Sequence, residues 1–193
     1  MKFNLNEKLK RSTARTLNDF SRIMFSLLEK KAFEDITIGE ICEASNYPRS
    51  TFYNYFDDIF DLMDYCWIAI TEEMHIDEYE IIDQEKRTWQ LFNHMYDYMM
   101  SMQEAISSIL LHNESNGKLL ESLKKYMKQK IKEIMLNCPE AEEFPISYEV
   151  VTEHYSNTIE LILEQCFLKK KKMSKKEALV CLDFFLGTLE RSK

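Results

Sequence analysis

The stretch that decides the fold is TIGEICEASNYPRSTFYNYF, residues 37–56. Thr37 at its start is followed three residues later by Glu40, which is the pattern of a capping box at a helix N-terminus. Apolar residues at positions 38 and 41 then supply a face that can be buried. The sequence therefore predicts a short helix over residues 38–44.

A second short helix is predicted directly after a tight turn. Asn46 can adopt the left-handed backbone conformation that such a turn requires, and Pro48 suits the first turn of a helix. This helix is predicted over residues 48–55, where Phe52 and Phe56, four residues apart, can anchor one face. The remaining positions carry hydrogen-bonding side chains: Arg49, Ser50, Thr51, Tyr53, Asn54 and Tyr55.

A longer amphipathic helix is predicted before these two, over residues 12–30. Its apolar positions recur at helical spacing: Leu17, Phe20, Ile23, Met24, Leu27 and Leu28. One long helix followed by two short helices and a tight turn is the helix-turn-helix arrangement. Only 3 Gly and 3 Pro occur in 193 residues, which is too little turn chemistry for many strands. The sequence thus predicts an all-α fold that opens with a three-helix helix-turn-helix domain.

Residues 38–62 resemble the N-terminal signature of the TetR family of transcriptional regulators. The residues that carry the resemblance are Ile41, Ala44, Tyr47, the run from Ser50 to Phe56, Asp61 and Leu62. Asn46 stands where the family usually has glycine, and Asp57 and Asp58 stand where it often has lysine or another polar residue. The resemblance implies a DNA-binding domain over residues 1–57 and a helical effector-binding and dimerisation domain over residues 58–193.

The resemblance also implies which residues contact DNA. Side chains at the start of the third helix would approach base edges in the major groove, and the fork of Arg49 suits a guanine. Residues around them would contact the backbone. The predicted set is Thr37, Pro48, Arg49, Ser50, Thr51, Tyr53, Asn54 and Tyr55, together with Lys10 and Arg15. The alternative is an ordinary surface helix whose tyrosines are structural.

Charge is distributed unevenly along the chain. Residues 1–15 contain five basic residues and one acidic residue, whereas the whole chain has a formal net charge of -8. Such a charge excludes a protein that coats nucleic acid non-specifically, because that mode depends on many Lys and Arg side chains. The pattern indicates a basic arm on an acidic body.

Periodicity predicts further helices over residues 58–76, 84–102, 119–134 and 146–168, one around residues 106–110, and a last helix that opens with a capping box at Ser174 and Glu177. The final two helices carry more apolar residues than one packed face needs. We therefore expect a homodimer joined by a four-helix bundle. Its predicted contacts are Ile159, Ile162, Leu182, Phe185, Leu186 and Leu189.

Aromatic and methionine side chains are concentrated in the middle of the chain. They predict a cavity for a small hydrophobic or aromatic effector, although such a stripe is also what a plain core looks like. The residues expected to line the cavity are Trp67, Trp89, Phe92, Tyr96, Met99 and Tyr126.

Other functional classes find no support in the sequence. It contains no glycine-rich phosphate loop, nucleophile elbow or catalytic His/Cys/Asp cluster, so we expect no enzyme and no cofactor. The four histidines are scattered, so no metal site is expected, and no apolar run approaches the ~20 residues of a membrane span. We expect a cytoplasmic homodimeric repressor that an effector releases from a palindromic operator. The alternative is a TetR-like activator or protein-interaction module without a small-molecule pocket.

Overall fold

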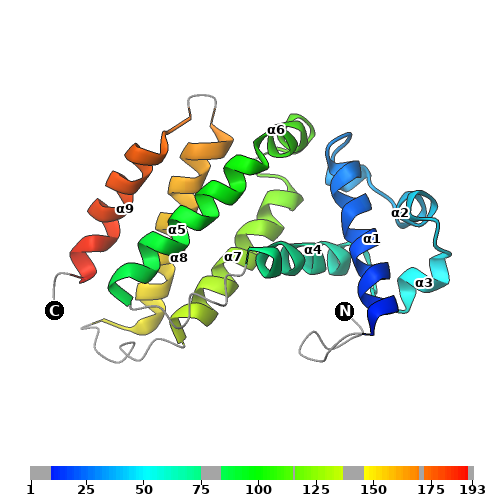
Figure 1. The fold of residues 1–193 in the computed structure, drawn as a ribbon, viewed down its shortest axis with the longest axis horizontal. Helices are drawn as coiled ribbons and strands as arrows, with labels where there is room; N and C mark the ends of the chain where they lie inside the picture. Colours follow the sequence, from blue (N-terminus) through cyan, green and yellow to red (C-terminus); the bar gives the residue numbers. More distant parts are fainter. Residues whose placement is uncertain (1–9, 75–83, 115, 137–145, 170–171, 191–193) are drawn as a thin grey trace. The chain divides into compact units, whose positions relative to one another are not determined.

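The computed structural model describes residues 10–74, 84–114, 116–136, 146–169 and 172–190. Within these ranges the chain forms helices and no strand, which confirms the predicted all-α class (Figure 1). The chain divides by packing into two units, one made of Met1–Glu73 with Ser107–Ser122 and the other of Met74–Ile106 with Leu123–Lys193.

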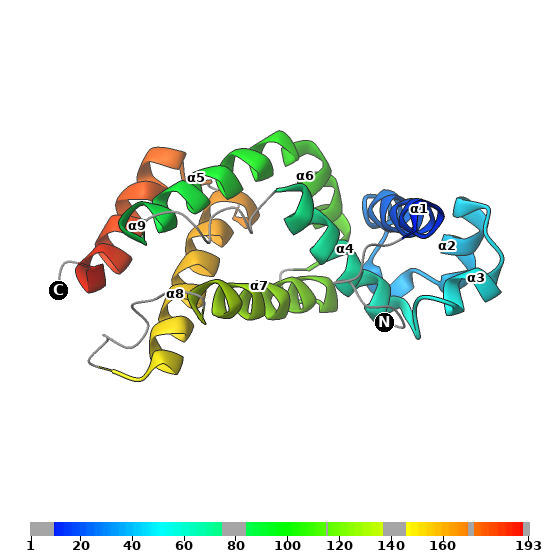
Figure 2. The same cartoon turned by 60° about the horizontal axis from the view of Figure 1, so that its bottom comes forward.

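The first unit contains the predicted helix-turn-helix. Its elements are α1 (Arg11–Leu28), the short 3-10 turn η1 (Phe33–Asp35), α2 (Ile38–Ser45), α3 (Arg49–Tyr53) and α4 (Ile59–Glu73). Figure 2 looks nearly along α1 and shows α2 and α3 on one side of it and α4 on the other. The predicted starts and ends of the first two helices lie within two residues of these bounds. The fourth helix was predicted to reach residue 76, and residues 75 and 76 lie outside the described ranges.

Aromatic rings fill the centre of the first unit. Phe20 of α1, Phe52 of α3 and Phe56 are fully buried. The ring centroids of Phe20 and Phe52 are 5.6 Å apart and those of Phe52 and Phe56 are 5.3 Å apart, within the range of favourable aromatic contacts. The two phenylalanines predicted to anchor the third helix therefore do so.

Residues 107–122 complete the first unit from far along the chain. Asn113 at the end of α6 (Gln103–His112) accepts a hydrogen bond from the backbone N–H of Phe33 at 2.9 Å. Glu34 accepts one at 3.0 Å from the backbone N–H of Lys118, the first residue of α7 (Lys118–Leu136). The indole N–H of Trp67 donates to the hydroxyl of Ser122 at 2.9 Å. Each contact joins α1–α4 to a segment more than 50 residues away.

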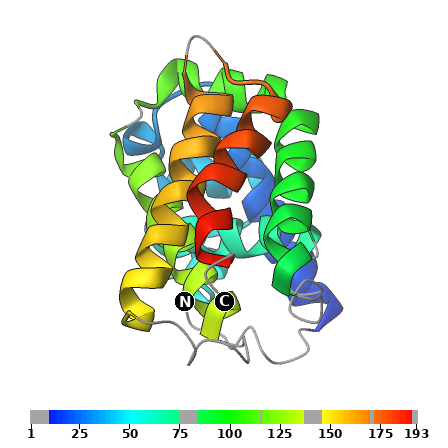
Figure 3. The ribbon, with the colours of Figure 1, turned by 90° about the vertical axis from the view of Figure 1, so that its left-hand side faces the viewer.

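The second unit packs α5 (Gln84–Ser101), α8 (Tyr148–Leu163) and α9 (Lys175–Glu190) around one hydrophobic core, with the later part of α7. Figure 3 shows α8 and α9 side by side and α5 beyond α9. The most deeply buried side chains include Phe92, Val151, Ile162, Phe167, Ala178, Leu182 and Leu186.

The end of α8 departs from the predicted regular helix. After Leu163 the chain makes one wider, π-helical turn over Glu164–Leu168, closed by a hydrogen bond from the N–H of Lys169 to the carbonyl oxygen of Glu164. The neighbouring residues Cys166 and Phe167 are both buried in this turn. The apolar pattern predicted the length of the helix correctly, but it did not reveal the wider winding.

The last helix begins as the sequence predicts. The carboxylate of Glu177 accepts from the backbone N–H of Ser174 at 2.9 Å, and the N–H of Glu177 donates back to the Ser174 hydroxyl at 3.4 Å. Lys175 then reaches across to Asp97 on α5, with both carboxylate oxygens within 2.8 Å. These bonds join the start of α9 to α5.

Candidate nucleic-acid interface

Helix α3 has one buried face and one exposed face. Phe52 is buried, while Arg49, Ser50, Tyr53 and Asn54 are exposed. Thr51 and Tyr55, also predicted to contact DNA, are half-buried. The helix starts at Arg49 with Pro48 as its N-cap in an extended conformation, so the prediction that Pro48 forms the first helical turn is wrong by one residue. Pro48 is itself exposed at the mouth of the turn.

The turn before α3 is fixed at three places. Asn46 has φ 58°, the left-handed conformation predicted for it, and its N–H and that of Tyr47 donate to carbonyls of the last turn of α2. The hydroxyl of Tyr47 donates to Asp19 of α1 at 3.1 Å, and its ring lies 5.3 Å from that of Phe20. The orientation of α3 therefore depends on α1 as well as on α2.

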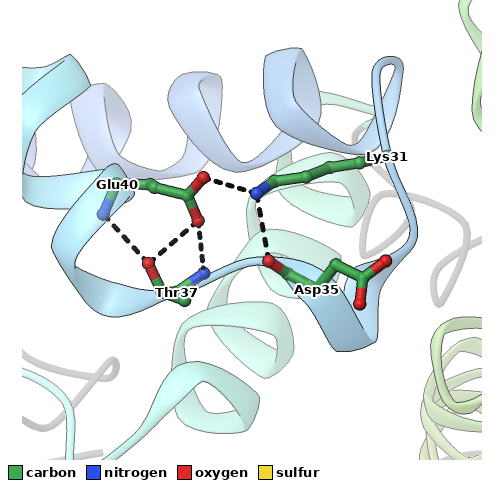
Figure 4. Close-up of polar contacts among 4 residues, drawn as sticks. All are labelled: Lys31, Asp35, Thr37 and Glu40. Carbon is green, nitrogen blue, oxygen red and sulfur yellow. Dashed lines mark hydrogen bonds and ion pairs between the residues drawn. The ribbon is translucent and has the colours of Figure 1, made fainter.

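The start of α2 is held by a closed network of polar contacts (Figure 4). Thr37 and Glu40 form the predicted capping box: the Thr37 N–H and hydroxyl donate to the Glu40 carboxylate, and the Glu40 N–H donates to the Thr37 hydroxyl. Lys31 donates to the same carboxylate and to the carbonyl oxygen of Asp35. The hydrogen bond from Lys31, with those from Thr37, lowers the pKa of Glu40 to about 2.

This network determines which groups at the start of α2 could meet DNA. Thr37 was predicted to contact the DNA backbone, and in this structure its donors point to Glu40. By helix geometry, the amides of Ile38 and Gly39 are the first-turn donors that lack an intrahelical acceptor. The sequence pattern revealed the capping box, but not Lys31, because a lysine nine residues before a glutamate has no local signature.

Arg49 lies against the first turn of α2. A Cβ atom built on Gly39 would be 2.6 Å from the Nη2 atom of Arg49. Among the residues that the structure describes, no carboxylate forms an ion pair with Arg49. The charge of Arg49 also acts on Cys42 of α2. Burial raises the pKa of the Cys42 thiol, and the positive charge of Arg49 lowers it. The guanidinium therefore lies beside the first turn of α2.

The other predicted basic contacts lie at the start of α1. Lys10 is the N-cap residue of α1, and Arg15 lies one turn further on; both are exposed. Figure 1 shows the start of α1 and α3 at the same end of the first unit. The structure therefore brings the start of α1, which carries Lys10 and Arg15, to the same end of this unit as α3.

The residues predicted to line an effector cavity fall in both units. Trp67 belongs to the first unit, where its ring packs edge-on against Phe25. In the second unit, Phe92 is 2% exposed and Tyr96 8% exposed, in contact with each other and, through Tyr96, with Phe167. Trp89 and Met99 are half-buried at the edge of the same core, and Tyr126 of α7 is half-buried as well. Phe92 and Tyr96 are thus buried in the core of the second unit.

The residues predicted to form a dimer interface are mostly interior. Ile159, Ile162, Leu182 and Leu186 are buried in the core of the single chain, Phe185 is exposed, and the side chain of Leu189 lies outside the described ones. Other apolar side chains of the same two helices are exposed: Val150 and Leu161 on α8, and Val180 and Phe184 on α9. We call these four residues the α8–α9 outer face. Sequence periodicity did not distinguish the buried side of these two helices from the exposed one.

Two of the free cysteines, Cys66 and Cys166, have buried thiols. Burial raises the pKa of Cys66 to about 12 and that of Cys166 to about 11, so both thiols are protonated at neutral pH. Within the same residues, no three His, Cys, Asp or Glu side chains gather in a way that could hold a metal ion.

In the part of the chain that the structure describes, no helix is long and apolar enough to span a membrane.

Two solved structures share this arrangement of helices. No family model and no curated protein matches the chain. Among solved structures, a candidate TetR-family transcriptional regulator from Syntrophomonas wolfei matches with a TM-score of 0.68 and 14% identity, over 92% of this chain and 96% of the other. A candidate fatty acid metabolism regulator from Clostridium perfringens matches with a TM-score of 0.51 and 14% identity, over 88% and 97% of the two chains. The chain therefore has the fold of the TetR-family transcriptional regulators.

Proposed function

We propose that the chain is a DNA-binding transcription regulator of the TetR type, acting as a homodimer on a near-palindromic operator. The observation that carries this proposal is α3, whose apolar side is fixed by Phe52 while Arg49, Tyr53 and Asn54 are exposed on the other. A short helix held in this way after a tight turn is how helix-turn-helix proteins present side chains to the major groove. The shared fold supports the same function.

The direct test is recovery of bound DNA. The full chain is mixed with duplexes of random sequence and, separately, with fragmented genomic DNA, and the bound fraction is sequenced. We expect a motif with two related half-sites centred about one helical turn, ~10 base pairs, or a multiple of it apart. If no sequence is enriched over the starting pool in either experiment, the proposal is wrong.

Variants then separate base contacts from backbone contacts. Asn54→Ala is expected to relax the preference at one base position per half-site, because an amide side chain can pair with an adenine edge. Lys10→Ala and Arg15→Ala are expected to weaken binding to all sequences alike and to flatten its dependence on salt. Glu43→Ala, an exposed position on the far part of α2, serves as the control.

Support for a homodimer comes from the α8–α9 outer face. Phe184 is 70% exposed and Val180 63% exposed, one helical turn apart on α9. The imidazole of His154, on α8 between Val150 and Leu161, lies 3.1 Å from the carbonyl oxygen of Phe185 and joins the two helices at this face. An apolar surface of this kind is costly to leave in water, and a second copy would cover it with an identical surface around a two-fold axis.

The proposed effector is a small hydrophobic molecule that shifts the chain between states with high and low operator affinity. Half-buried Trp89 and Met99 at the edge of the second core support an entry point there. With 2 tryptophans in the chain, fluorescence of the native protein and of Trp89→Phe can be compared as hydrophobic compounds are added. Compounds that change the fluorescence of the native protein but not that of Trp89→Phe should also weaken operator binding.

A regulator without a small-molecule pocket is the second candidate. The burial of Phe92, Tyr96 and Phe167 and the contacts between their rings support it, because rings packed against one another fill space that a ligand would need. If no compound changes the fluorescence while the native chain still selects an operator, this candidate replaces the effector-controlled repressor.

A further inference from the structure

The guanidinium of Arg49 lies against Gly39, the second residue of α2. A Cβ atom at position 39 would be 2.6 Å from the Nη2 atom and 3.6 Å from the Cζ atom of Arg49. Cβ atoms do not approach other heavy atoms as closely as 2.6 Å, so a side chain at this position would require the end of the Arg49 side chain to shift. The guanidinium thus occupies the volume that a side chain at position 39 would fill.

Among the described residues, Arg49 is the only group whose position requires glycine here. No glycine among the described residues has a positive φ, so the backbone of Gly39 accepts any L residue. Outside Arg49, the nearest atom to that Cβ position is the hydroxyl oxygen of Thr37, at an ordinary contact distance of 3.7 Å. Glycine within a helix is also less favourable than alanine. The feature of the fold that an alanine would disturb is therefore the placement of Arg49.

The placement of Arg49 indicates what it contacts. Arg49 is the first residue of α3, and its side chain leans back toward the first turn of α2, whereas Asn54 is the C-cap residue at the other end of α3. Within the proposed interface, a guanidinium there lies beside α2, whose capped end is fixed by the network around Glu40. A guanidinium donates well to phosphate oxygens.

We propose that Gly39 is a positioning residue: because it has no side chain, it leaves room for the Arg49 guanidinium on the first turn of α2, where the guanidinium binds a phosphate of the DNA backbone rather than a base. This inference rests on the proposed function and deepens it. It replaces the expectation from the sequence that Arg49 pairs with a guanine.

The test uses Gly39→Ala, Arg49→Ala and the double variant in the full chain. Two probes are used: the duplex that the native chain selects from a random pool, and an unselected duplex of equal length. Gly39→Ala is expected to keep or raise the melting temperature, because alanine favours the helix. It should weaken binding to both duplexes by the same factor, on the order of tenfold for one lost charged contact. The slope of log Kd against log salt should fall by about one.

The double variant separates positioning from other effects. Gly39→Ala should cause no further loss when Arg49 is already alanine, since the methyl group acts through the guanidinium. Equal losses in both backgrounds would overturn the proposal, because the methyl group would then obstruct DNA itself. Full affinity in Gly39→Ala, or a changed preference at one base pair with unchanged binding to the unselected duplex, would also overturn it. If the native chain selected no duplex at all, the proposed function would fail, and this inference with it.

Discussion

Asn113 has an importance that its place in a loop does not suggest. The side chain is 5% exposed; its oxygen accepts from the N–H of Phe33, and its nitrogen donates to the carbonyl oxygen of Ile109 at 2.9 Å. Asn113→Ala would leave the Phe33 N–H without this acceptor in a buried place. We expect the free energy of unfolding, measured with urea, to fall by about 1–3 kcal/mol.

The control for this prediction lies in the same loop. Asn116 is exposed, so Asn116→Ala should change the free energy of unfolding by no more than about 0.5 kcal/mol. Equal effects of the two substitutions would show that Phe33 obtains another acceptor when Asn113 is removed.

Glu40 gives the first unit a defined response to acid. Its pKa is lowered from 4.5 to about 2, chiefly by the hydrogen bond from Lys31 and then by those from Thr37. A carboxylate with a lowered pKa stabilises the folded state fully above its unfolded pKa, and this contribution is lost as the pH falls toward the folded pKa.

The prediction compares the native chain with Glu40→Gln. The difference between their urea midpoints should be constant at neutral pH and shrink as the pH falls from about 4.5 toward about 2. Glu43→Gln, which removes a carboxylate from an exposed position of the same helix, is the control for the change of charge. A difference that stays constant down to the lowest pH would contradict the role given to Glu40.

Among the elements, the turn between α2 and α3 depends most on one backbone conformation. Asn46 has a positive φ, which a β-branched residue adopts at a cost of about 1–2 kcal/mol. We expect Asn46→Val to lower the free energy of unfolding by about that amount, and Asn46→Gly to leave it nearly unchanged. Thermal unfolding of the two variants checks this, and equal melting temperatures would show that the turn can relax without a left-handed residue.

Local signals explain why the helices of the first unit were predictable. A capping box such as Thr37 with Glu40, a left-handed residue such as Asn46, and apolar residues four apart each act within a few neighbouring positions. The candidate DNA-binding face followed from the same signals, because the buried Phe52 defines which side of α3 is exposed.

Contacts between distant segments explain what the sequence did not reveal. The bond from Phe33 to Asn113 spans 80 residues, and the packing of Arg49 on Gly39 depends on the angle between two helices. The sequence also did not indicate which side of α9 is exposed. Phe184 and Leu182 are equally apolar in sequence, and only packing against α8 and α5 separates the exposed one from the buried one.

For the whole molecule, the α8–α9 outer face predicts the oligomeric state. The native chain should have a solution mass of twice 23.1 kDa by sedimentation equilibrium. Phe184→Glu changes an exposed residue, so the variant should keep its helix content and become a monomer. Leu182→Glu places a charge in the core of the single chain and should unfold it instead. A folded, monomeric native chain at micromolar concentration would contradict the proposed dimer.

The first unit is complete only when residues from two separate parts of the chain are present. A gene segment that encoded Met1–Glu73 alone would leave Phe33 without Asn113 and Trp67 without Ser122. Recombination that joined such a segment to an unrelated sensor would therefore deliver an unfinished domain. If the chain is the regulator proposed here, new combinations of DNA-reading and sensing parts must arise by substitution within an intact gene, or by exchange with a relative whose residues at the end of α6 and the start of α7 make the same bonds.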